Sequence, residues 1–345
     1  MRPDFIVRLS ALALAAATLW PAVADAAPRP VPDIYPKFYT TMIGRLEPSD
    51  FAGMRKYDVL EVGNWAFTTG NGFRDSMETL RAENPNLMVM QDWSAAISCD
   101  NWWSDETPDR EAWGDTLEAH EYDWILHDKN GGKWFINGES EICNQGRINL
   151  TNLDAARAYA KYIAKATVHE YPDLIEGIRL DEVAETIHWW HSVPQRWDPG
   201  VDSIDSNRDG IGDSNEDLTL WWSAGVDTFL ATLRAEFGPE YLIIVNGYLA
   251  PEHFQYVNGR WHEGHPHEHK KGYESGMTDP ERGYLGGDTL YSDTPAHFSG
   301  LFCLNFTPSY NYDPDELSTK YVPFPHPGLH KYVKWTLASS LMSDG

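Results

Sequence analysis

Short apolar segments alternate with longer segments of helical periodicity along most of the chain. Apolar residues recur at three-to-four spacing over residues 153–171, directly after the N-cap residue Asn152, and again over residues 218–237. An alternation of this kind is typical of parallel strands joined by crossover helices. The predicted strands are residues 38–43, 59–62, 87–91, 124–127, 178–180, 242–245, 300–306 and 335–342.

The fold class predicted from this order is α/β, a (β/α)8 TIM barrel, because strands and helices continue to alternate through most of the 345 residues. An open doubly wound sheet is the alternative, but no G-x-G-x-x-G turn follows a strand. Residues 339–345 resemble the end of a strand, where a closed barrel would require one more helix. The sequence therefore predicts a barrel truncated at its last β/α unit.

The first 26 residues have the features of a signal peptide. Arg2 and Arg8 are followed by an apolar run at 9–20 and by the small-x-small sequence at 24–26. We therefore expect a secreted or periplasmic protein, with residues 27–345 forming the barrel and no membrane partner after cleavage. An uncleaved signal anchor is the alternative.

The net charge and the aromatic content indicate which kinds of molecule the protein can bind. The net charge of −25 opposes binding to phosphate backbones and anionic lipids, so a nucleic-acid partner is not expected. The chain holds 15 Trp and 17 Tyr, and such rings stack on the C–H faces of sugars, which favours a carbohydrate substrate. Export permits a disulfide, and we hypothesise a Cys99–Cys143 bridge with Cys303 buried and reduced.

The most informative segment is Gly177-Ile178-Arg179-Leu180-Asp181-Glu182. Strand alternation places Arg179 and Asp181 on one face, so the guanidinium is expected to hold the carboxylate in one orientation, while Glu182 points outward. An acid at the carboxyl end of a barrel strand is well placed for catalysis. A purely structural Arg–Asp pair is the alternative.

This segment resembles the nucleophile segment on the fourth strand of barrel glycoside hydrolases in the alpha-amylase and alpha-galactosidase-like clans. More of residues 36–345 is similar to bacterial putative glycosyl hydrolases related to the latter clan, through Asn64-Trp65, Asp92-Trp93, Val245-Asn246-Gly247, Arg260-Trp261-His262-Glu263 and Leu341-Met342-Ser343-Asp344-Gly345. One departure from the amylase pattern is Asn246-Gly247, at the place where that clan carries its general acid.

The resemblance implies a glycosidase with Asp181 as nucleophile and Glu263 as acid/base, acting on an oligo- or polysaccharide with retention. Two carboxyl groups of different pKa suit this chemistry. A non-catalytic carbohydrate-binding barrel is the alternative function. The expected substrate-binding residues are Asn64, Trp65, Asp92, Trp93, Arg179, Asn246 and Asn305.

A twelve-residue loop at 205–216, within an insertion at about 198–217 after the fourth strand, has the EF-hand pattern. Gly210 stands at position six, where such loops turn sharply, and Ile211 at position seven offers its carbonyl. The oxygen-bearing positions one, three, five, nine and twelve are Asp205, Asn207, Asp209, Asp213 and Glu216. We expect a structural Ca²⁺ here and no organic cofactor; a solvated acidic loop is the alternative.

Overall fold

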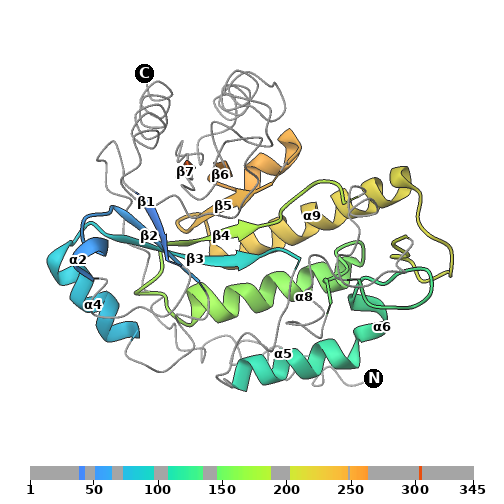
Figure 1. The fold of residues 1–345 in the computed structure, drawn as a ribbon, viewed down its shortest axis with the longest axis horizontal. Helices are drawn as coiled ribbons and strands as arrows, with labels where there is room; N and C mark the ends of the chain where they lie inside the picture. Colours follow the sequence, from blue (N-terminus) through green and yellow to red (C-terminus); the bar gives the residue numbers. More distant parts are fainter. Residues whose placement is uncertain are drawn as a thin grey trace, which may run out of the picture.

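The computed structural model describes residues 39–42, 51–63, 73–96, 108–134, 146–187, 203–247, 249–262 and 303–304. They form one seven-stranded sheet in which every neighbouring pair of strands is parallel and the strand order follows the sequence (Figure 1). The strands are β1 (Tyr39–Met42), β2 (Val59–Gly63), β3 (Met88–Ser94), β4 (Gly177–Asp181), β5 (Leu242–Asn246), β6 (Gly259–His262) and β7 (Cys303–Leu304).

This sheet agrees with the α/β prediction and is compatible with a TIM barrel. A doubly wound sheet reverses its strand order at a switch point, and the order here never reverses, so that alternative is wrong. Four further predictions fall outside the described residues: the last strand at 335–342, the truncated last β/α unit, the signal peptide and the Cys99–Cys143 bridge.

The two faces of the sheet bury different residues. One face packs under the helices through Leu60, Val89, Ile178 and Ile243. The opposite face, which we call the inner face, gathers a separate apolar cluster of Val59, Met88, Met90, Leu242, Ile244 and Trp261. Because side chains alternate along a strand, β2, β3 and β5 each contribute to both clusters, and this explains why their sequences are largely apolar.

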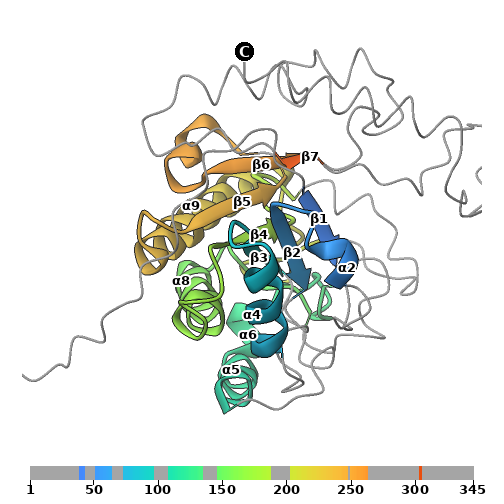
Figure 2. The same ribbon diagram turned by 90° about the vertical axis from the view of Figure 1, so that its left-hand side faces the viewer.

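Helices α4, α8 and α9 lie on one side of the sheet, and α8 packs along α9 (Figure 2). The described helices are α2 (Phe51–Met54), α4 (Phe73–Glu83), α5 (Pro108–Ala119), α6 (Glu121–Trp124), α8 (Leu153–Ala164), the π-helix η2 (Lys165–His169), α9 (Asn215–Phe237) and the 3-10 helix η4 (Pro251–Tyr256). None of the described helices is both long and apolar enough to cross a membrane.

Both strongly periodic segments are helical as predicted. The Asn152 side chain accepts hydrogen bonds from the Asp154 and Ala155 N–H groups, which starts α8, and η2 continues that helix to His169. The second helix begins at Asn215, three residues earlier than predicted, because Ser214 caps it by accepting from Asp217 N–H.

The predicted strand at 124–127 is wrong. Trp124 ends α6, while Ile125 and His127 form only isolated antiparallel bridges to Ile148 and Lys133. The segment lies in the connection between β3 and α8, where burial of Ile125 and Leu126 produces an apolar pattern without a strand partner in the main sheet. The same connection contains α5, which the sequence pattern did not predict.

Candidate active site

Polar side chains gather on the inner face where β2 to β5 end. Glu61 comes from β2, Asp92 from β3, Arg179 and Asp181 from β4, and Asn246 from β5. The register pairs Asp92 with Arg179 directly, and the other strands run alongside in parallel. Their carboxyl ends therefore meet at one edge, which is where α/β enzymes build their sites.

Arg179 lies at the centre of this group with only 7% of its surface exposed. Its Nε donates to Glu61 Oε1 at 3.1 Å, and its Nη1 lies 2.9 Å from Asp181 Oδ2 and 3.5 Å from Asp92 Oδ1. The guanidinium also lies over the Trp261 ring, 4.9 Å from its centroid. One buried cation thus contacts three carboxyl groups and an indole face.

Burial sets the pKa values of the two deeper acids. Burial raises the pKa of Glu61 to about 8, although the Arg179 charge opposes the rise. Burial likewise raises the pKa of Asp92 to about 6, again against Arg179. For Arg179 itself, burial lowers the pKa, but the charges of Glu61, Asp92 and Asp181 outweigh it and the pKa is raised. Near neutral pH, Glu61 is therefore expected to keep its proton.

Asp181 is the most accessible acid of the group, with 40% of its side chain exposed. Its Oδ1 accepts from Asn246 Nδ2 and from Glu182 N–H, both at 2.8 Å, while its Oδ2 faces Arg179. The predicted Arg179–Asp181 contact is present. Three donors on two oxygens hold the carboxylate in one orientation and leave it open to solvent.

Glu182 does not point outward as strand alternation predicted. Its backbone has a φ of 59°, which turns the chain at the end of β4. Arg147, only 1% exposed, donates from both terminal nitrogens to the Glu182 carboxylate at 2.5 and 3.0 Å, and Ser94 Oγ donates at 3.2 Å. A non-glycine residue in the left-handed region is strained, and such strain tends to occur at functional sites.

Trp93 was expected to bind sugar, but the structure places it in the core. It is 7% exposed and lies on the helix-facing side of β3, where its indole N–H donates to the Tyr159 hydroxyl at 3.1 Å. Because Asp92 faces inward, its neighbour must face the helices, and Trp93 is therefore a core residue. Of the other predicted site residues, Asn64, Trp65, Glu263 and Asn305 lie outside the described residues.

Three residues of this edge were not predicted: Glu61, Arg147 and Glu182 as an inward-facing partner. An acid between Leu60 and Val62 is a signal that could have identified Glu61, because a buried acid in a strand needs a charged partner. No signal in the sequence identifies Arg147, which reaches β4 from the segment before α8.

The predicted calcium loop folds around Asp205, which is 3% exposed. Its two oxygens accept from Asp209 and Gly210 N–H groups, and Gly210 has a φ of 81°, as the sharp turn requires. Burial raises the pKa of Asp213, with the charges of Asp205 and Asp209 adding to the rise. Across the described part of the chain, no three His, Cys, Asp or Glu side chains are grouped to hold a metal ion. The calcium site stays a prediction.

Comparison with known proteins gives structural neighbours only. No family model matches the chain, and no curated protein matches its sequence. A GH31 dextranase of Flavobacterium johnsoniae, complexed with glucose, matches with a TM-score of 0.42 and 14% identity over 69% of this chain, which spans only 28% of the dextranase.

This chain covers a larger share of two further structural neighbours. The chitinase domain of the spore coat protein CotE from Clostridium difficile has a TM-score of 0.40 and 12% identity, covering 80% of this chain and 66% of that one. Xylanase B from Clostridium stercorarium has a TM-score of 0.31 and 16% identity, covering 66% and 62%. These neighbours are glycoside hydrolases.

Proposed function

We propose that the protein is a glycoside hydrolase that cleaves O-glycosidic bonds of an oligo- or polysaccharide with retention of configuration. Asp181 is the proposed nucleophile and Glu263 the proposed acid/base. The observation that carries the proposal is the Asp181 carboxylate, which is held by three donors yet 40% exposed at the carboxyl edge of the sheet. A carboxylate that is fixed in orientation and still open to solvent can reach a bound substrate.

In the first step, an Asp181 oxygen bonds to the anomeric carbon while the glycosidic C–O bond breaks and Glu263 protonates the leaving oxygen. In the second step, Glu263 takes a proton from water, whose oxygen attacks the same carbon and releases Asp181. Arg179, Asn246 and the Glu182 N–H would keep the carboxylate aimed through both steps.

Glu263 follows directly after His262, the last residue of β6. Strand β5 alone separates β6 from β4, and the carboxyl ends of all three meet at the same edge. Trp261 on the inner face contacts Arg179, so the end of β6 is close to the acidic group. A retaining enzyme needs its two carboxyl groups about 5–5.5 Å apart, and this placement of β4 and β6 supports the pairing.

Asp92 has a different proposed role. It is 20% exposed, contacts Arg179 and has a pKa raised to about 6 by burial, so it suits a hydrogen bond to a sugar hydroxyl. Arg179 itself is surrounded by its acids, and we propose that it positions Asp181 rather than binding substrate. Asn246 acts in the same way through Asp181 Oδ1.

The test is hydrolysis of a panel of soluble polysaccharides and aryl glycosides. Asp181→Asn should abolish sugar release, whereas Asp115→Asn, an exposed acid on α5, should not change it. Glu263→Gln should lose far more activity on a poor leaving group than on a nitrophenyl glycoside, which needs no proton. Proton NMR of the first product shows whether the anomer is retained.

Two outcomes would contradict the proposal. Sugar release by Asp181→Asn at the parent rate would remove the nucleophile assignment. Sugar binding without any release by the unmutated chain would favour the second candidate function, a non-catalytic carbohydrate-binding barrel.

We further propose that the protein is secreted or periplasmic and that the loop at 205–216 binds a structural calcium ion. The oxygen-only donor set fits a hard cation, and the groups that would hold it are the side chains of Asp205, Asn207, Asp209, Asp213 and Glu216 and the carbonyl of Ile211. Such an ion would stabilise the loop that precedes α9.

A further inference from the structure

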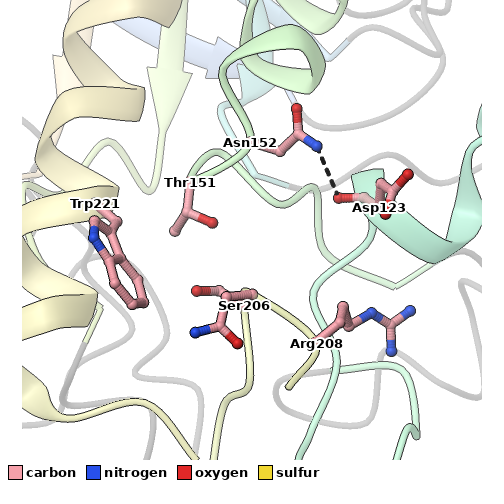
Figure 3. Close-up of a pocket in the computed structure, with 7 residues that line it drawn as sticks. Asp123, Thr151, Asn152, Ser206, Arg208 and Trp221 are labelled. Atoms are coloured by element: carbon pink, nitrogen blue, oxygen red, sulfur yellow. Dashed lines mark hydrogen bonds between the residues drawn. The ribbon is translucent and has the colours of Figure 1, made fainter. Parts of the chain in front are cut away.

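A pocket of about 350 Å³ lies outside the acidic edge of the sheet (Figure 3). It forms where the end of α6, the start of α8, the loop before α9 and the first turns of α9 meet. Its lining residues are Asp123, Thr151, Asn152, Ser206, Asn207, Arg208 and Trp221. None of them belongs to the group around Asp181, and the proposed hydrolysis uses none of them.

The lining has the chemistry of a sugar site. One side is the indole of Trp221, and the rest consists of two amides, two hydroxyls, one carboxylate and one guanidinium. A sugar ring offers a C–H face for an aromatic ring and hydroxyls for planar polar groups. The protein has a net charge of −25, which disfavours an anionic ligand.

Several of these groups are already held in place. Arg208 Nε donates to the Tyr122 carbonyl at 2.7 Å, and its guanidinium lies 4.5 Å from the centroid of the Tyr122 ring. The Thr151 hydroxyl donates to Asn149 Oδ1 at 2.6 Å, and Asn149 Nδ2 donates to the Ser206 carbonyl at 2.9 Å. A pocket whose walls are tied together loses less entropy when it binds.

Exposed apolar side chains occur next to several of the lining residues in the sequence. The large hydrophobic residues that are exposed in the described part of the chain are Tyr122, Leu153, Ile211 and Leu220. Tyr122, Leu153 and Leu220 are each adjacent in sequence to a lining residue, and Ile211 belongs to the loop that supplies three of them.

The pocket and the acidic edge lie on the same face of the molecule. Helices α8 and α9 both begin beyond the carboxyl ends of the strands (Figure 1). Arg147 pairs with Glu182 beside Asp181, and Thr151, four residues later, lines the pocket. The backbone from Arg147 to Thr151 spans at most about 14 Å, to which the Arg147 side chain adds its own length. A glycan of several sugar units would be needed to extend from one site to the other.

We infer that this pocket is a second carbohydrate-binding site, which takes a distal unit of the glycan whose scissile bond lies at Asp181. The inference rests on the proposed function for its choice of substrate class. The indole of Trp221 stacks on the sugar ring, while the polar groups of Asn152, Thr151 and Arg208 hydrogen-bond to its hydroxyls.

The experiment uses the full chain carrying Asp181→Asn, so that the glycan is not consumed. Its retardation in affinity gel electrophoresis is measured with dextran, starch and xylan in the gel. Trp221→Ala, introduced in addition to Asp181→Asn, should weaken about tenfold the apparent affinity for the polysaccharide that slows the protein in the gel. Trp221→Phe in its place should keep part of that affinity. The matched control is Tyr57→Ala, a half-buried aromatic residue that precedes β2 at the opposite edge of the sheet and should leave the affinity unchanged.

Thermal melts establish that each variant is folded. If Trp221→Ala does not fold, Arg208→Met, which removes the polar end of a half-buried side chain, should also weaken retention. An unchanged affinity in the folded pocket variants, or no retention by any of the three polysaccharides, overturns the inference. Retention that depends on Trp221 in a protein whose unmutated form hydrolyses nothing leaves the inference standing and removes only the proposed hydrolysis.

Discussion

The pair between Arg147 and Glu182 makes a sharp prediction, because it connects a strained backbone to the proposed nucleophile. Arg147→Met keeps most of the buried volume but leaves the Glu182 carboxylate without its bidentate partner. Breaking a fully buried pair costs about 3–5 kcal/mol, and an exposed pair about 0–1 kcal/mol. Glu182 is 30% exposed and can be partly rehydrated, so we expect a loss of about 2 kcal/mol.

The assay is urea unfolding of the two single variants and the double variant. Glu182→Gln with Arg147→Met completes a double-mutant cycle, and the expected coupling energy is about 1.5 kcal/mol. The matched control is Arg157→Met on α8, whose pair with Asp154 is exposed on both sides and should cost less than about 0.5 kcal/mol. Additive losses in the cycle would refute the argument that this pair stabilises the turn.

Activity gives a second readout of the same change. Glu182 carries both the strained φ of 59° and the N–H that donates to Asp181 Oδ1, so a shift of its backbone would move that donor. Release of that strain should misalign the nucleophile, so Arg147→Met should lower kcat about tenfold and leave KM nearly unchanged. A variant that is destabilised but keeps its kcat would show that Arg147 is structural only.

Three further predictions concern the helices, the buried acid and the loop. Asn152→Ala removes the cap of α8 and should lower the free energy of unfolding by about 1 kcal/mol, measured by urea unfolding; no change would mean that the cap hydrogen bonds are replaced by water. Folding raises the pKa of Glu61 from 4.5 to about 8, so the folded state keeps a proton that the unfolded state loses, and stability should fall as pH rises between these values. Glu61→Gln, which keeps an acceptor for Arg179, should flatten that slope in melts from pH 5 to 8, whereas an unaltered slope would contradict burial as the cause. If calcium occupies the loop at 205–216, chelation should lower Tm and elemental analysis should find the ion. An ion present at a hundred times its Kd adds about 2.7 kcal/mol to the free energy of unfolding, and chelation removes this contribution. An unchanged Tm with no calcium found would leave a solvated acidic loop.

The local sequence was enough to predict those helices and strands whose apolar residues recur with one clear periodicity. The helix that starts at Asn152 and the strand around Arg179 could be predicted because capping and alternation depend only on neighbouring residues. The contact between Arg179 and Asp181 follows for the same reason, since residues two apart on a strand share a face. The parallel sheet follows from the repeated alternation of strand and helix.

Only the tertiary structure decided what surrounds those residues. Trp93 lies in the core because its neighbour Asp92 faces inward. Ile125 is not part of the sheet because its segment lies in the connection before α8. Glu61 and Arg147 reach Arg179 and Glu182 across 118 and 35 residues of sequence. Contacts between residues so far apart in the sequence depend on the register between paired strands and on where the connecting segments pack against the sheet. No local pattern encodes them, so the sequence alone determined the strand that carries Asp181, and the packed sheet decided which groups hold that carboxylate.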